Sequence, residues 1–189
     1  MNNKQNYFNY LQQRSFLGYI YRRYFLYPKL SNYLKGEVLD IGCGIGDFLA
    51  FRLSSVGVDI NEFNVKLCKN RGLNAYIMLE NILPFPSNKF DSILLDNVLE
   101  HIKDPKPLLS EIKRVMRRGG YLLVGVPGIK GFASDPDHKV FYDEFKLQKL
   151  AQSQGYSITL YKHLPLWKSF LFSKILKQYC VYALLVVKD

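Results

Sequence analysis

Short apolar runs alternate with helical stretches along most of this chain, and that alternation limits the folds it can adopt. The runs are rich in Val, Ile and Leu and lack a regular polar–apolar alternation, which is typical of strands buried on both faces of a parallel sheet. Five runs have this character: 37–41, 55–60, 74–79, 90–97 and 120–127. Two more strands are predicted over 156–164 and 180–189. The pattern predicts an α/β fold of three layers, with a doubly wound seven-stranded sheet in the middle.

Helical patterns occupy most of the gaps between these runs, at residues 46–53, 62–72, 104–120 and 142–155. A further amphipathic helix with a lysine face is predicted over 164–179. Before the first run, residues 4–34 show aromatic and aliphatic side chains every three or four positions, and Pro28 predicts a break or a kink there. We therefore divide the chain into an N-terminal helical segment, residues 1–35, and an α/β domain, residues 36–189.

The bulk properties predict a soluble globular chain with an uneven charge. The 189 residues are 48% hydrophobic and contain no apolar run long enough for a membrane span and no apolar leader, so we expect a cytoplasmic protein. The net charge of +10 comes from residues 1–35, with six basic and no acidic side chains, and from residues 160–189, with five basic and one acidic. These ends suit an anionic substrate, nucleic acid or lipid headgroups, or are simply solvated surface.

The turn after the first run has the composition of a ligand-binding loop. Its glycines allow a sharp backbone turn and a close approach by a ligand, and ligands of open α/β sheets bind at the carboxyl ends of the strands. Asp40 and Asp47 flank the turn, which disfavours a pyrophosphate and favours a ligand with a cationic part. Asp59, at the end of the second run, can accept hydrogen bonds from ribose hydroxyls. S-adenosylmethionine, a nucleoside without phosphates that carries a positive charge, fits these residues.

Four stretches, in order, resemble the class I S-adenosylmethionine-dependent methyltransferases. The first two motifs of that family are similar to "VLDIGCGIGDFL" and "VGVDI". The third stretch, "LPFPSNKFDSILLDNVLEHIKDP", resembles the branch that includes ubiquinone and menaquinone biosynthesis methyltransferases (methyltransferase type 11). The fourth, "LLSEIKRVMRRGGYLLVGVPG", resembles the helix and strand that follow in that branch. The resemblance covers roughly residues 36–160. It implies a Rossmann-like sandwich whose sheet is mostly parallel with an antiparallel last strand, and a methyltransferase enzyme.

The resemblance also assigns cofactor roles at the ends of the first four strands. Asp40 and the backbone of the turn would hold the methionine part, Asp59 the ribose, and Ile60 the adenine. After the third strand, either Glu80 or Asn81 would meet the adenine amino group. The other predicted contacts fall in three places. They are Gly42, Cys43, Gly44 and Gly46 along the turn, Ile82 beside the adenine, and Asp96 and Asn97 on the methyl side.

An acceptor hydroxyl would need a base to take its proton, and two histidines are candidates. His138 lies in the loop that commonly covers the acceptor in the resembled family, close in sequence to Asp135 and Asp137, and His101 follows the fourth strand in "LEH". A purely structural role is the alternative for both. One loop with this spacing is not a typical metal site, and the three scattered cysteines form no metal motif, so we expect no metal.

The acceptor itself is less constrained. The aromatic and basic residues of segment 1–35 suit a lid over a small-molecule acceptor or a peripheral contact with a membrane, and packing on the sheet is the simpler alternative. We expect methylation of a small molecule, with oxygen favoured and a lipid- or sugar-linked acceptor included. An RNA or protein methyltransferase is less favoured because no RNA-binding module is visible. A non-catalytic S-adenosylmethionine-binding protein is the third option, and the oligomeric state is left open.

Overall fold

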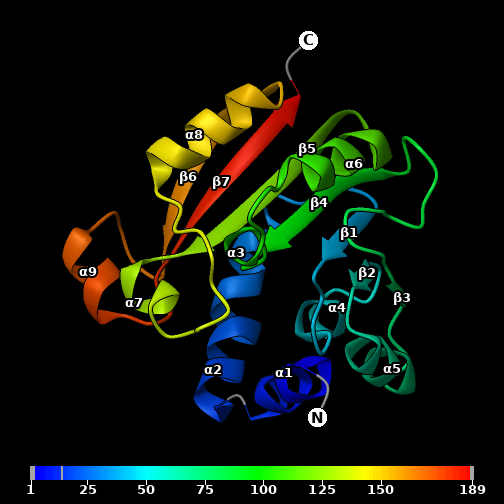
Figure 1. Cartoon of the computed structure of the whole chain (residues 1–189), viewed down its shortest axis with the longest axis horizontal. Coiled ribbons are helices and arrows are strands. Elements are labelled where there is room, and N and C mark those ends of the chain that lie inside the picture. The colour runs from blue at the N-terminus through cyan, green and yellow to red at the C-terminus, as the bar shows by residue number, and fades with distance from the viewer. Residues whose placement is uncertain (1–2, 14, 188–189) are drawn as a thin grey trace.

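The computed structural model describes residues 3–13 and 15–187 as a three-layer α/β sandwich (Figure 1). The sheet has the strand order β3-β2-β1-β4-β5-β7-β6. Strand β7 is antiparallel to β5 and β6, and the other neighbours pair in parallel. The predicted sheet is therefore confirmed. Its strands are β1 (Val38–Ile41), β2 (Val56–Asp59), β3 (Ala75–Ile77), β4 (Phe90–Asp96), β5 (Met116–Pro127), β6 (Tyr156–Leu164) and β7 (Cys180–Val187).

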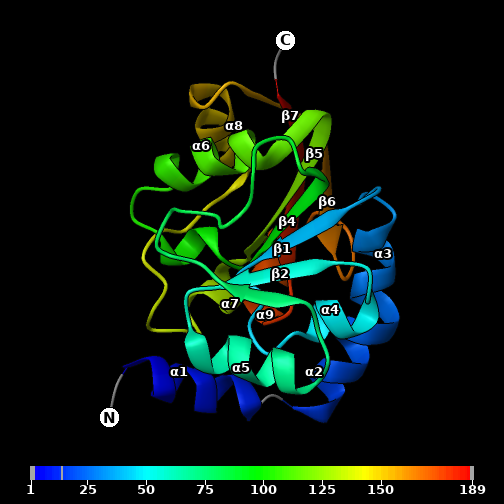
Figure 2. The ribbon, with the colours of Figure 1, turned by 90° about the vertical axis from the view of Figure 1, so that its right-hand side faces the viewer.

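Helices cover both faces of this sheet (Figure 2). Buried side chains of α6 (Lys106–Val115) and α8 (Glu144–Ser153) pack against one face, and those of α3 (Tyr27–Ser31) and α4 (Asp47–Phe51) against the other. Because the chain runs from β1 outward to β3 and then returns to β4 on the other side of β1, the carboxyl ends of β1 and β4 flank the switch point where such sheets bind ligands. None of the described helices is long and apolar enough to cross a membrane.

The N-terminal segment breaks at a different place from the one predicted. Helix α1 (Asn3–Gln12) is followed by Ser15, whose side chain accepts a hydrogen bond from the Gly18 amide and so begins α2 (Phe16–Tyr21). Pro28 instead lies inside a continuous helical run, just after the π-helical turn η1 (Arg22–Leu26). The wider turn accommodates a proline, which has no amide hydrogen for the helical ladder.

Two predicted helices are too long. Helix α6 ends at Val115, and the residues from Met116 to Gly120 belong to β5, because Met116 pairs with Phe90 and the Arg117 guanidinium bridges to Asp91 on β4 at 2.7 Å. The helix predicted over 164–179 is restricted to α9 (Phe170–Ile175), which begins where the Ser169 side chain caps it. In both places contacts between distant segments outweigh local helical propensity.

Candidate active site

The turn between β1 and α4 lies at the carboxyl ends of the strands and depends on its glycines. Gly42, Gly44 and Gly46 have φ values of 72°, 53° and 81°, which side-chain-bearing residues rarely adopt. A Cβ at Gly42 would lie 2.5 Å from a Val98 methyl carbon, and one at Gly46 would lie 2.7 Å from a Leu73 methyl carbon. Glycine at 42 and 46 is therefore required by both backbone conformation and space.

We expect the Gly46→Ala substitution to lower the free energy of unfolding by about 3 kcal/mol, the sum of the left-handed backbone cost and the forced shift of Leu73 and Cys68. Urea unfolding followed by circular dichroism measures it. Gly72→Ala is the matched control, because Gly72 has a φ of 71° but a Cβ added there would have no atom within 4 Å. That variant should lose only about 1 kcal/mol. Equal losses in the two variants would contradict the steric argument.

Asp59, at the end of β2, holds the turn in place. Its Oδ2 accepts hydrogen bonds from the Gly44 amide at 2.8 Å and the Asn64 side-chain amide at 3.2 Å, and its Oδ1 accepts one from the Asn61 amide at 2.7 Å. Burial raises the pKa of Asp59 despite these hydrogen bonds. A carboxylate offers about four acceptor positions, so these three donors leave room for one further hydrogen bond, such as that of a ribose hydroxyl.

Three further aspartates lie around the turn, and with Asp59 we call them the acid rim: Asp40, Asp47 and Asp96. Asp40 is 5% exposed, and burial together with the nearby Asp96 and Asp59 carboxylates raises its pKa well above the ordinary value. No described residue donates a hydrogen bond to the Asp40 carboxylate. Asp47 by contrast is paired with the Arg22 guanidinium at 3.1 Å. The rim is thus short of positive charge around Asp40, and a cationic ligand would supply it.

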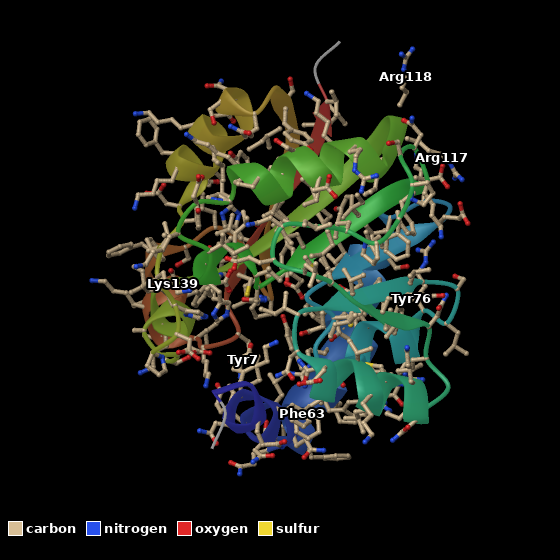
Figure 3. The ribbon with its side chains drawn as sticks, turned by 45° about the vertical axis from the view of Figure 1, so that its right-hand side comes forward. Tyr7, Phe63, Tyr76, Arg117, Arg118 and Lys139 are labelled. Carbon is tan, nitrogen blue, oxygen red and sulfur yellow. The ribbon has the colours of Figure 1, made fainter. Side chains whose placement is uncertain are left out.

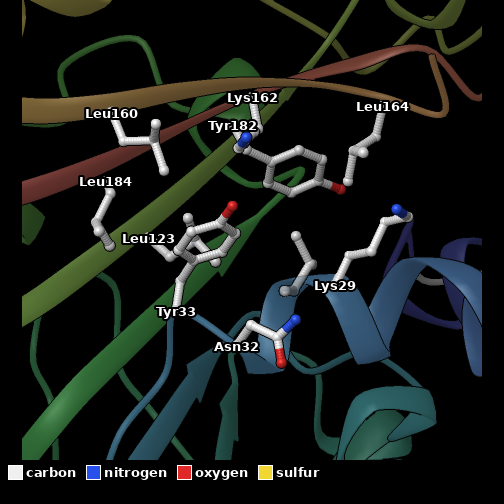
Figure 4. A pocket seen from close by; sticks show the side chains of 10 residues that line it. Lys29, Asn32, Tyr33, Leu123, Leu160, Lys162, Leu164, Tyr182 and Leu184 are labelled. Carbon is white, nitrogen blue, oxygen red and sulfur yellow. The ribbon is translucent and has the colours of Figure 1, made fainter. Parts of the chain in front are cut away.

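Asp96 and its neighbours form the β4 side of the rim. The Asp96 Oδ1 accepts hydrogen bonds from the Tyr182 hydroxyl at 3.0 Å and from the Asn97 side-chain amide at 2.8 Å. Asn97 is exposed and has a φ of 54°. The Tyr182 ring also lines a cavity of about 180 Å³ between α3 and the sheet (Figure 4). That cavity is lined by no residue of the acid rim, so it is separate from the candidate cofactor site.

The predicted adenine contacts lie at the ends of β2 and β3. Ile60 and Ile82 are 53% and 55% exposed, which leaves two apolar side chains available to a ring. Glu80 is exposed and Asn81, with a φ of 59°, is half-buried, both in a tight turn closed by a bridge between residues 79 and 82. Cys43 is buried, and its backbone amide donates to Val58 O at 3.0 Å.

Helix α1 lies across this site, and sequence reasoning did not identify its contacts. The Lys4 ammonium donates to Ile60 O at 3.0 Å, and the Asn61 side-chain amide donates to Lys4 O at 2.8 Å. Leu11 is buried, and a Cβ added at Gly44 would lie 3.5 Å from a Leu11 methyl carbon. The Tyr7 ring lies 6.3 Å from the His101 ring, and Figure 3 shows Tyr7 above α1, at the opposite end of the molecule from Arg117 and Arg118.

The two predicted bases, His101 and His138, come together in space with a residue that sequence reasoning missed, Glu100. The histidine ring centroids are 4.6 Å apart, and His138 Nε2 is 3.7 Å from Glu100 Oε1. His101 and Glu100 belong to the 3-10 turn η2 (Leu99–His101), and His138 follows α7 (Ile129–Phe132). The Lys139 and Val140 amides donate to Glu100 O at 2.7 and 3.1 Å, which fixes the loop after α7 against η2.

Glu100 is fully buried, and its two carboxylate oxygens accept no hydrogen bond from another described residue. Burial, with contributions from Asp96 and Asp135, raises its pKa to about 8. Burial and the neighbouring His138 lower the pKa of His101. The one signal for Glu100 in the sequence was an acid in the "LEH" motif, next to an apolar residue.

Residues 39–124 match the family model described as "Methyltransferase domain". These residues are a methyltransferase domain. The model is that of the type 11 branch of the class I S-adenosylmethionine-dependent methyltransferases, so a little under half of the chain is similar to that branch, as the motifs had indicated. The cofactor of this family is S-adenosylmethionine, and the acid rim fits it: Asp40 would hold its cationic methionine part, and Asp59 a ribose hydroxyl.

Individual proteins are similar to parts of this chain or share its fold. An uncharacterized protein of Methanocaldococcus jannaschii is 38% identical over 92 residues, which cover 49% of this chain and 45% of that protein. A tRNA (carboxymethyluridine(34)-5-O)-methyltransferase of Xenopus tropicalis is 30% identical over 110 residues, 53% of this chain and 18% of the relative. The crystal structure of a possible histamine N-methyltransferase of Thermotoga maritima shares the fold, with a TM-score of 0.78 at 20% identity and full coverage of both chains. The chain spans about half, or less, of the length of these curated relatives.

Proposed function

We propose that this protein transfers the methyl group of S-adenosylmethionine to a hydroxyl oxygen of a small-molecule acceptor. The observation that carries the proposal is the acid rim, in which the buried Asp40 carboxylate lacks a described partner of opposite charge beside a turn built for close approach. In the reaction, the acceptor hydroxyl gives its proton to a base, His138 or His101, and its oxygen attacks the methyl carbon. The carbon–sulfur bond breaks, its electron pair goes to sulfur, and the products are a methyl ether and S-adenosylhomocysteine.

Tyrosine hydroxyls and histidine rings support an oxygen acceptor beside the rim. The Tyr21 hydroxyl is buried and has no hydrogen-bond partner among the described residues, and burial with the nearby Cys180 and Asp96 raises its pKa. Such an orphaned group suits a polar ligand. We place the acceptor between Tyr7 of α1, Tyr21 and the histidine pair, with α1 as the lid. The protein then mainly aligns the acceptor with the methyl group and excludes water.

The test is formation of S-adenosylhomocysteine by the purified full chain with a panel of catechols, hydroxyquinols, phosphosugars and total tRNA. Calorimetry with S-adenosylhomocysteine runs in parallel. Turnover with a hydroxyl-bearing small molecule supports the proposal. If the chain binds neither S-adenosylhomocysteine nor S-adenosylmethionine, the proposal is overturned. Turnover with tRNA alone would make RNA the acceptor in place of a small molecule.

Transfer to RNA is the second candidate, because the basic ends suit phosphates and the Xenopus relative is named for a tRNA substrate. Binding through those ends would weaken steeply with salt, since each neutralised phosphate releases a counterion. A flat salt dependence would remove this candidate.

We also propose that the acceptor is collected at an anionic membrane surface through α9 and the segment before it. Four apolar side chains there are more than half exposed: Trp167 (66%), Phe170 (68%), Leu171 (60%) and Ile175 (56%). Lys174 and Lys177 are exposed beside them, and the Lys174 ammonium lies 4.3 Å from the Phe170 ring centroid. Apolar side chains next to lysines are the composition of an interfacial membrane contact.

We expect the chain to co-sediment with vesicles of phosphatidylglycerol, and the Phe170→Ala, Leu171→Ala double variant to bind them at least 10-fold more weakly. The reason is the loss of two apolar side chains, each contributing about 1 kcal/mol when partly buried in the interface. Phe145→Ala is the matched control, because Phe145 is 64% exposed on α8 with the Lys149 ammonium 4.4 Å from its ring. Equal weakening in the control, or no vesicle binding by the unmodified chain, would refute the membrane contact.

A further inference from the structure

We propose that Glu100, His101 and His138 bind one divalent transition-metal ion. One ligand atom from each residue lies within 4.8 Å of the others, and His138 Nε2 is 3.7 Å from Glu100 Oε1. Donor atoms around one zinc-like ion, with bonds of about 2.0–2.2 Å, lie roughly 3.4 Å apart. An ion therefore needs to draw these ligand atoms together by no more than about 1.4 Å. The proposal rests on the geometry and burial of these three residues.

The hydrogen bond behind His138 matches that of a metal ligand. His138 Nδ1 lies 2.8 Å from Phe132 O, so that nitrogen carries the hydrogen and Nε2 presents its lone pair to Glu100. Histidine ligands almost always give their second nitrogen to a carbonyl or carboxylate in this way, which fixes the ring for the metal.

The Glu100 carboxylate is the second, independent observation. It is fully buried, and neither oxygen accepts a hydrogen bond from another described residue. Buried carboxylates are ordinarily paired or bound to metals, because removal from water is costly. No described lysine or arginine forms an ion pair with Glu100, and an ion at this point would satisfy the carboxylate.

Two histidines and one carboxylate with open coordination positions suit ions such as Zn²⁺, Mn²⁺ or Fe²⁺. The ligand set differs from the one considered in the sequence, because Glu100 and His101 take the place of Asp135 and Asp137 beside His138. The role of the ion rests on the proposed function: held by Glu100, His101 and His138, it would acidify an acceptor hydroxyl, so that the proton would pass to solvent and the oxygen would attack the methyl carbon of S-adenosylmethionine. His101 and His138 then act as ligands rather than as bases.

The experiment titrates Co²⁺ into the EDTA-treated full chain and follows the visible absorption of the bound ion, with Zn²⁺ calorimetry as a second measurement. We expect one ion per chain. Glu100→Gln and His138→Gln should each weaken Co²⁺ binding at least 100-fold. His163→Gln is the matched control, because His163 also faces a carboxylate, Glu144 at 3.4 Å, but has no second histidine. That variant should bind Co²⁺ like the unmodified chain.

Calorimetry with S-adenosylhomocysteine separates this proposal from the proposed function. Binding of S-adenosylhomocysteine without Co²⁺ binding overturns the metal site and leaves methyl transfer standing. Co²⁺ binding without S-adenosylhomocysteine binding supports the metal site and overturns the proposed methyl transfer. Glu100→Gln keeps the shape of the side chain, and thermal unfolding shows whether it folds. If it folds and still binds Co²⁺ with unchanged absorption, the metal site is also overturned.

Discussion

The Asp59→Ala variant is expected to bind S-adenosylhomocysteine at least 100-fold more weakly than the unmodified chain. Two losses combine. The ligand loses a charged acceptor for its ribose, worth about 1.5–3 kcal/mol, and the Gly44 and Asn61 amides lose the oxygen that fixes the turn. Because the Asn61 amide is left without a partner at a buried position and the Gly44 amide at a half-buried one, the free energy of unfolding should also fall by about 2–3 kcal/mol. Calorimetry and urea unfolding measure the two effects.

Asp91→Asn is the control for that experiment. Asp91 lies at the other end of the sheet, near the start of β4, where it bridges to Arg117 at 2.7 Å and accepts the Glu37 amide at 2.8 Å. Its loss should lower stability modestly and leave S-adenosylhomocysteine binding unchanged. If Asp59→Ala binds the ligand normally, the assignment of the rim as the cofactor site is wrong.

The sheet and the turn could be predicted because their determinants are local. Buried parallel strands have a composition of their own, and a glycine turn between an apolar run and a helix needs only its own residues to be recognised. The prediction went wrong where distant contacts decide. The residues from Met116 to Arg118 have helical propensity, but Met116 pairs with Phe90 of β4, and the Arg117 guanidinium bridges to Asp91 on that strand.

The candidate site shows the same division. Asp40 and Asp59 were predicted because each lies near the carboxyl end of a strand, and strand ends converge at one edge of a parallel sheet. Asp96, at the end of β4, was predicted from the family resemblance. The pairing of His101 with His138, by contrast, depends on how the loop after α7 folds back onto η2. Glu100 was missed because burial of a charged side chain has no local signal. The contacts of α1 with Ile60 and Asn61 also have no local signal, because they join Lys4 to residues more than 50 positions away in the sequence.

The Asp40→Asn variant should shift stability and ligand binding in opposite directions. Without ligand, the amide removes a carboxylate that is buried beside Asp96 and Asp59 with a raised pKa, so the free energy of unfolding at neutral pH should rise by about 1 kcal/mol. S-adenosylmethionine should bind about 10–100-fold more weakly, because its ammonium group loses a charged partner. Thermal unfolding and calorimetry provide the two readouts.

The effect of Asp40 on the free energy of unfolding should depend on pH. Because the folded protein holds the Asp40 proton more tightly than the unfolded chain does, the unmodified chain loses stability as pH rises from the ordinary aspartate pKa through the raised one. The asparagine variant has no such loss, so its advantage should be absent in acid and grow toward neutral pH. Asp47→Asn is the contrasting variant on the same rim: it leaves the Arg22 guanidinium without the Asp47 charge and should lower stability. A destabilised Asp40→Asn variant with unchanged S-adenosylmethionine binding would make Asp40 a structural carboxylate, and the cationic part of the cofactor would then need another partner.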